Sequence, residues 1–119
     1  NEVFRFIRML ANKEYQEIDE TFDLDQMYPE AKWKYTELGK TMDAYYEGHE
    51  WIRLDPEARN KANTKITESD DRNTWTIEQT LVDPEALNDF QIIFSLSITE
   101  AKENSTIKIV PLKLKSITK

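Results

Sequence analysis

The spacing of apolar residues changes once along this chain, near residue 60, from a helical repeat to a strand repeat. Before that point, apolar residues recur three and four positions apart, which is typical of amphipathic helices. After it, they alternate with polar residues, which is typical of strands with one buried face. Helices followed by a run of strands indicate an α+β fold. With 119 residues, the sequence predicts a single domain over 1–119, with helices within about 2–48 and strands within about 62–118.

The helical half contains three apolar stripes. The first comprises Val3, Phe4, Ile7, Leu10 and Ala11, the second comprises Tyr15, Ile18 and Phe22, and the third comprises Tyr35, Leu38, Met42, Tyr45, Tyr46 and His49. The first two fit two helices or one kinked helix. We expect Asp25 or a neighbour to cap the third helix, with Pro29 in its first turn. We expect Gly48 to end that helix in the left-handed conformation.

The strand half contains two clear alternations and one interrupted alternation. The first comprises Trp75, Ile77, Gln79 and Leu81, and the second comprises Phe90, Ile92, Phe94, Leu96 and Ile98. A third strand is predicted over Thr106–Thr118, where the phase changes between Ile109 and Leu112, so a bulge is expected at Val110-Pro111. Ala62–Thr67 is predicted to be a short first strand. Lysines decorate the last strand and would protect a sheet edge: Lys108, Lys113, Lys115 and Lys119.

A sheet with one apolar face needs a cover, and the amphipathic helices are available to provide it. The predicted fold is therefore α+β, with N-terminal helices packed on a curved antiparallel sheet of three to four strands. This order of elements resembles the cystatin-like or nuclear-transport-factor-like cone.

The composition excludes several classes of site. With no Cys and a single His, a thiolate zinc site and a multi-histidine metal site cannot be built within one chain. Two Gly residues cannot form a P-loop, and Asp19–Glu30 lacks the Gly of a calcium loop. We expect no catalytic residues, no metal and no cofactor. The pairs Asp70-Asp71 and Asp83-x-Glu85 are predicted to lie in solvated turns.

The charge balance bears on partners and location. Residues 1–60 carry eight Lys/Arg against fourteen Asp/Glu, and the whole chain has a net charge of −7. An acidic surface repels phosphates, which disfavours direct nucleic-acid binding. No apolar run is long enough to cross a bilayer, so we expect no membrane partner, and the lack of Cys fits the cytoplasm. The chain begins at Asn1 rather than Met, which indicates a processed form or part of a longer protein.

Five side chains are candidates for a ligand pocket at the mouth of such a cone. They are Tyr45, Tyr46, His49, Trp51 and Trp75, and Trp33 would lie near them. Aromatic rings supply contact area with few rotors, and a lone histidine near neutral pH could act as a general base. Aromatic residues in phase with the core are more often simply core, and a histidine at a helix end more often interacts with the helix dipole. Both interpretations stay open on the sequence alone.

Two stretches carry a family resemblance. The first is Asp43-Ala44-Tyr45-Tyr46-Glu47-Gly48-His49 followed by Asp55-Pro56-Glu57-Ala58-Arg59, and the second runs from Trp75 to Glu85 and continues with Asn88-Asp89-Phe90. Together they resemble the C-terminal domain of unknown function of bacterial superfamily II DEAD/DEAH-box helicases. Phe90 stands where a Trp is expected, and Leu96-Ser97-Ile98 replaces an apolar-Asp-apolar step. The family's motor residues belong to other domains, so none is carried over.

These observations lead to three hypotheses. The first is a non-catalytic accessory domain of a helicase-like protein, acting through interdomain or protein–protein contacts. The second is a stand-alone small-molecule binder or isomerase that uses the aromatic pocket. The third is weak contact with single-stranded nucleic acid through Lys108, Lys113 and Lys115. The binding partner and the oligomeric state are not determined by the sequence.

Overall fold

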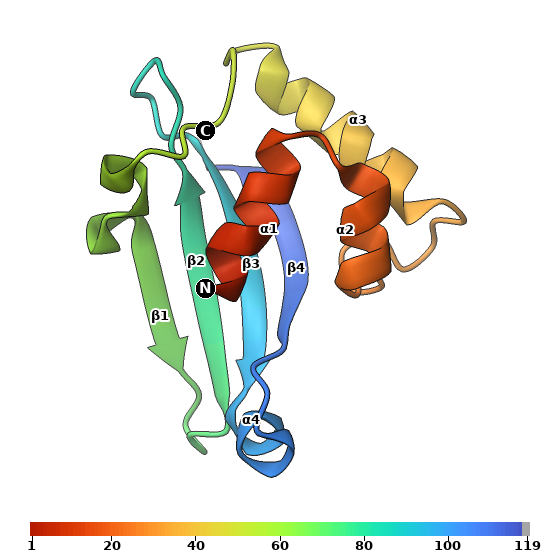
Figure 1. Cartoon of the computed structure of the whole chain (residues 1–119), viewed down its shortest axis with the longest axis vertical. Helices are drawn as coiled ribbons and strands as arrows, with labels where there is room; N and C mark the ends of the chain where they lie inside the picture. Colours follow the sequence, from red (N-terminus) through yellow and green to blue (C-terminus); the bar gives the residue numbers. More distant parts are fainter. Residues whose placement is uncertain (118–119) are drawn as a thin grey trace.

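The computed structural model describes residues 1–117 and confirms the α+β class (Figure 1). Three helices come first: α1 (Glu2–Ala11), α2 (Tyr15–Thr21) and α3 (Lys34–Tyr46). Two 3₁₀ turns, Pro56–Arg59 and Lys61–Asn63, lead into the sheet. The remaining elements are β1 (Thr64–Glu68), β2 (Thr74–Leu81), β3 (Phe90–Ser97), α4 (Ile98–Asn104) and β4 (Ile109–Ser116). Within these residues, no helix is both long and apolar enough to cross a membrane.

The four strands form an open antiparallel sheet in the order β1-β2-β3-β4, as expected of a meander. The predicted alternation is confirmed in its two clearest strands. Ile77, Gln79 and Leu81 are buried on β2, and Ile92, Phe94 and Leu96 are buried on β3. The predicted first strand exists as well, two residues later at its start than expected.

β4 contains a bulge, as predicted, but at Leu112 rather than at Val110-Pro111. Ile93 pairs with Lys113 and Phe94 pairs with Pro111, so Leu112 has no opposite residue on β3. The extra residue changes the phase of the strand, and both Ile109 and Leu114 are therefore buried on the same side. Because β4 is an edge strand of this sheet, a proline in it costs no ladder hydrogen bond to a further strand.

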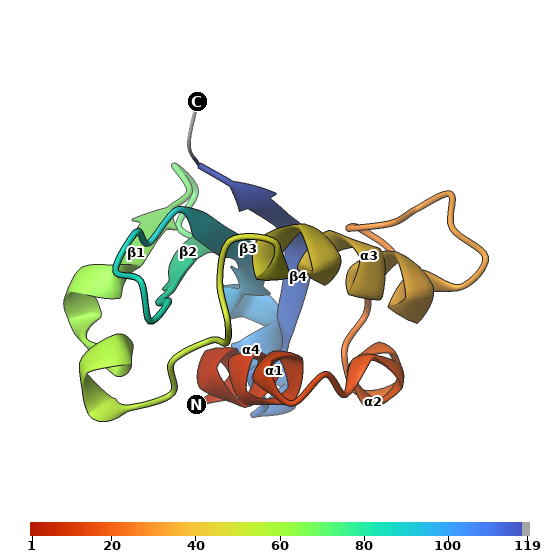
Figure 2. The same ribbon diagram turned by 90° about the horizontal axis from the view of Figure 1, so that it is seen from above.

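The helices cover one side of the sheet. Figures 1 and 2 show α1 in front of the strands, α2 beside it beyond the β4 edge, and α3 across the upper end of the sheet near β4. The ring of Phe6 on α1 makes edge contacts with Phe22 (5.1 Å) and Phe94 (5.2 Å), and so joins both helices to β3. The stripe of α3 is buried at Leu38, Met42 and Tyr45, as the helical spacing predicts.

The start and end of α3 differ from the prediction. The helix begins at Lys34 rather than near Asp25, because Asp23 Oδ1 accepts the N–H of Asp25 and the amides of Met27 and Tyr28 turn back to the carbonyl of Leu24. Pro29 therefore lies in this turn region and not in the helix. No glycine has a positive φ, so Gly48 does not adopt the left-handed conformation. Its amide instead donates to the carbonyl of Tyr45.

The segment between β3 and β4 was predicted incorrectly. Ile98 begins helix α4 rather than ending a strand, because the hydroxyl of Ser97 caps the helix by accepting the N–H of Glu100. Ser105 then ends the helix with a left-handed φ of 54°. β4 consequently starts at Ile109 instead of Thr106, and Ile107 is exposed. Thr118 and Lys119 lie outside the described residues.

Candidate functional site

The single histidine is buried just after α3. The N–H of His49 donates to the carbonyl of Tyr45, which continues the last helical turn. The hydroxyl of Tyr45 donates to the carbonyl of Trp51 at 2.8 Å and holds the following segment against the helix. The Tyr45 ring lies 4.7 Å from the imidazole, and the Phe90 ring lies 6.0 Å from it. Two aromatic rings therefore pack against the imidazole of His49.

The loop after β2 brings three carboxylates to this histidine. Asp83 is fully buried, and its two oxygens accept the N–H groups of Leu87 and Asn88. Ala86 and Asn88 adopt left-handed conformations with φ of 61° and 49°. These contacts fold the loop back on itself, so that its acidic side chains point towards α3.

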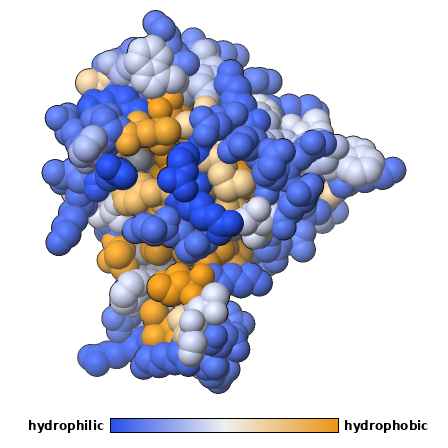
Figure 3. All heavy atoms as spheres, in the orientation of Figure 1, coloured by the Kyte–Doolittle hydropathy of each residue, from blue (hydrophilic) through white to orange (hydrophobic). Residues whose placement is uncertain are grey.

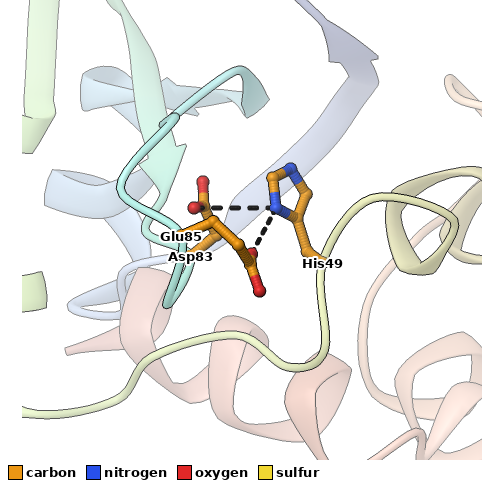
Figure 4. Close-up of side chains that lie close together, drawn as sticks. All are labelled: His49, Asp83 and Glu85. Atoms are coloured by element: carbon orange, nitrogen blue, oxygen red, sulfur yellow. Dashed lines mark hydrogen bonds and ion pairs between the residues drawn. The ribbon is translucent and has the colours of Figure 1, made fainter.

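The carboxylates contact both ring nitrogens. Nδ1 of His49 lies 2.6 Å from Oε1 of Glu85 and 3.6 Å from Oδ1 of Asp83 (Figure 4), and Nε2 lies 2.7 Å from Oδ1 of Asp89. Ionised carboxylates only accept hydrogen bonds, so both nitrogens must donate. The geometry therefore describes an imidazolium that bridges Glu85 and Asp89.

The electrostatics of the cluster agree with this protonation state. Burial favours the neutral ring, but the hydrogen bonds to Glu85 and Asp89 and the charge of Asp83 outweigh it and raise the pKa of His49. Burial, reinforced by the charge of Asp83, also raises the pKa of Tyr45, which keeps its hydroxyl a donor. His49, Asp83 and Glu85 each offer a ligand atom, all within 4.8 Å of one another, so these three could hold a metal ion.

A second feature is an apolar groove at the other end of the sheet. It has a volume of about 670 Å³ and lies where α1 leaves the inner face of β1 and β2 uncovered. In Figure 3, apolar side chains gather below α1, over the lower half of the sheet and towards α4. The apolar residues that line the groove are Val3, Phe4, Ile66, Trp75, Ile77, Leu96, Ile107 and Ile109. Ile66 and Ile107 are 53% and 59% exposed, so the groove is open to solvent.

The structure divides the five predicted pocket residues among three places. Tyr45 packs against both Tyr46 and His49, and the ammonium of Lys13 lies over the half-buried Tyr46 ring at 4.5 Å. Trp51 is 53% exposed and lines a separate shallow hollow with Leu54 and Pro84. Trp75 lines the apolar groove. Trp33 is exposed at the start of α3.

Sequence reasoning missed the carboxylates that contact His49. The prediction of a solvated turn at Asp83-x-Glu85 is wrong for Asp83, which is fully buried. The signal in the sequence was the close spacing of Asp83, Glu85 and Asp89 in a chain that has a single histidine. That signal shows only that acidic groups are close in sequence, whereas the contact with His49 spans 34 to 40 residues.

Together, the fold and these features define a small α+β domain with a buried histidine–carboxylate cluster and an open apolar groove. The chain belongs to the family described as Domain of unknown function (DUF3516), which matches residues 1–114. Comparisons with curated proteins and with solved structures give no match.

Proposed function

We propose that this chain is a non-catalytic accessory domain, the C-terminal module of a helicase-like protein, which docks on the motor region of that protein through the apolar groove. The observation that carries the proposal is the groove itself. Its lining side chains Ile66, on β1, and Ile107, in the segment after α4, are open to solvent. Exposed contiguous apolar surface typically marks a site of contact with another protein surface. The helicase context comes from the resemblance of the Asp43–His49 and Trp75–Phe90 stretches.

Charge favours a motor region as the occupant. The domain carries a net charge of −7, and most of the excess lies in residues 1–60, after α1, which itself carries Glu2 against Arg5 and Arg8. A nucleic-acid motor presents basic surface, because it must neutralise phosphates. Attraction between an acidic module and a basic core would steer their association, while apolar burial in the groove would supply affinity.

The same assignment implies a finer fold relationship and a location. We propose a cystatin-like or nuclear-transport-factor-like architecture, supported by helices on one face of a four-stranded antiparallel sheet with a bulged edge strand. A bacterial cytoplasmic setting follows from the helicase context and is compatible with the absence of Cys.

The docking role is tested with Ile66→Ser and Ile107→Ser, separately and together. Both side chains line the groove and are largely exposed, so their replacement should leave the fold intact. Leu87→Ser is the matched control, because Leu87 is 63% exposed and lies on the β2–β3 loop. We expect the groove variants to weaken binding of the domain to the separated motor region by tenfold or more, and the control to leave it unchanged.

Two results would contradict the docking role. One is an absence of binding between the wild-type domain and the motor region in low salt. The other is an unwinding rate of the full-length protein that does not change when residues 1–119 are deleted.

The groove volume favours one alternative, a stand-alone small-molecule binder, since about 670 Å³ falls in the usual range for ligand pockets. An isomerase-like site would need polar side chains converging in that groove. Gln79 is the buried polar residue there, and its side-chain oxygen already accepts the Thr64 hydroxyl. Two results together would favour this alternative. One is saturable binding of a planar apolar fluorophore that Trp75→Ala abolishes. The other is binding of the motor region that the groove variants leave unchanged.

A further inference from the structure

We propose that His49, Asp83 and Glu85 form a binding site for one Zn²⁺ ion, with Asp89 holding the imidazole in the required orientation. The site is separate from the apolar groove and does not depend on the docking role. One ligand comes from the segment after α3 and two come from the β2–β3 loop, so a bound ion would join these two parts of the chain.

The donor set matches the ligand chemistry of zinc. One imidazole nitrogen and two carboxylate oxygens are common Zn²⁺ ligands, and three protein ligands leave a position for water. Nδ1 of His49 and the nearest oxygens of Asp83 and Glu85 all lie within 4.8 Å of one another. Figure 4 shows both carboxylates directed at the same ring nitrogen. Small side-chain movements would place an ion between them.

The charge of the cluster is unbalanced without a further cation. Three carboxylates surround one imidazole, which can supply a single positive charge. Asp83 is fully buried, its two oxygens accept the N–H groups of Leu87 and Asn88, and its Oδ1 forms a 3.6 Å ion pair with Nδ1 of His49. Because Glu85 and Asp89 share the same imidazole, a second cation at this place would reduce the repulsion among the carboxylates. Replacing the Nδ1 proton by Zn²⁺ adds one positive charge where Asp83 and Glu85 meet.

Asp89 occupies the position of an orienting partner. Its Oδ1 lies 2.7 Å from Nε2, the nitrogen that faces away from Asp83 and Glu85. Histidine ligands of metals almost always donate their second N–H to such a group, which fixes the ring and increases its basicity. This contact selects Nδ1 as the ligand atom.

The ion can reach the site from solvent. The side chain of Glu85 is 34% exposed and that of Asp89 is 18% exposed, whereas His49 and Asp83 are enclosed. Glu85 is therefore the outermost ligand. Its position allows it to capture an ion before His49 and Asp83 complete the site.

The single histidine makes a direct test possible, because every imidazole signal of the 119-residue chain belongs to His49. The chain is treated with a chelator, and ZnCl₂ alone is added at neutral pH while ring ¹⁵N resonances and heat of binding are recorded. We expect one ion per chain, a shift of Nδ1 to the metal-bound range, retention of the Nε2–H signal, and a higher melting temperature. An absence of binding, or binding that leaves the His49 resonances in place, would overturn the proposal.

Variants locate the site. Glu85→Gln and Asp83→Asn should each weaken Zn²⁺ binding at least tenfold, and Asp89→Asn should weaken it by about 10–100-fold, as for other outer-sphere partners. Glu103→Gln on α4 is the control and should bind as the wild type does. If Asp83→Asn fails to fold, Glu85→Gln still decides the question, since Glu85 is partly exposed. Unchanged affinity in Glu85→Gln would refute the assignment.

Discussion

The hydroxyl of Tyr45 donates a 2.8 Å hydrogen bond to the backbone carbonyl of Trp51 and so closes the turn that places His49. Tyr45 is the last buried residue of α3, and Trp51 belongs to the extended segment that follows. The N–H of Arg53 then donates to the carbonyl of Val82, which ties that segment to the end of β2. The two contacts bring the segment after α3 alongside the β2–β3 loop.

Tyr45→Phe should destabilise the domain by about 1–3 kcal/mol, because it leaves the Trp51 carbonyl without its partner in a partly buried place. The free energy of unfolding in urea measures this change. Tyr35→Phe is the matched control: Tyr35 is half-buried on the same helix, and no hydrogen bond of its hydroxyl is found among the described residues. A loss no larger than that of the control would show that the Tyr45 contact is not stabilising.

His49 and Asp89 should be energetically coupled. A double-mutant cycle with His49→Gln and Asp89→Asn should give an interaction energy of about 0.5–3 kcal/mol, since the two side chains share a 2.7 Å contact and His49 is buried. Measurements are made in the presence of a chelator, so that only the protein contact contributes. Strictly additive effects on the free energy of unfolding would contradict the geometry described for the cluster.

Deletion of Leu112 should abolish cooperative folding or severely destabilise the domain. Removing the extra residue forces either Ile109 or Leu114 to the solvent face, because a one-residue slip reverses every side chain of a strand. Circular dichroism during thermal unfolding reports the outcome. Leu112→Ala keeps the residue count and should cost much less, so equal effects of deletion and substitution would refute the role of the bulge.

Tyr15 should resist ionisation at high pH. Burial, with smaller contributions from Tyr46 and Asp43, raises its pKa from 10.0 to about 12. The folded state therefore holds this proton more tightly than the unfolded state does. Its stabilising contribution is complete below pH 10 and is lost as the pH rises towards 12.

Absorbance at 295 nm during alkaline titration measures this ionisation, and the difference between the wild type and Tyr15→Phe isolates Tyr15. Tyr35→Phe serves as the comparison. A Tyr15 difference curve with its midpoint near pH 10 in the folded protein would contradict the prediction.

Local patterning was sufficient for most elements. The spacing of apolar residues predicts which side of an element is buried, because the helical and strand periods differ. This holds for the stripes at Val3–Leu10 and Leu38–Tyr45 and for the alternation at Ile77–Leu81. The phase change between Ile109 and Leu112 indicated a bulge for the same reason, although it lies at Leu112 and not at Val110-Pro111. Local signals competed at Asp23–Pro29, where an Asx turn replaced the expected helix start, and at Ser97, where a side-chain cap began a helix within an apolar run.

The amino-acid sequence by itself determined the α+β class, the burial pattern of the strands and the bulge, since these depend on residues a few positions apart. Only the tertiary structure decided that the five aromatic and histidine candidates occupy three places and that Asp83, Glu85 and Asp89 meet His49. The physical reason is that side chains 34 to 40 residues apart approach only after α3 has packed on the sheet and the β2–β3 loop has folded back over its end.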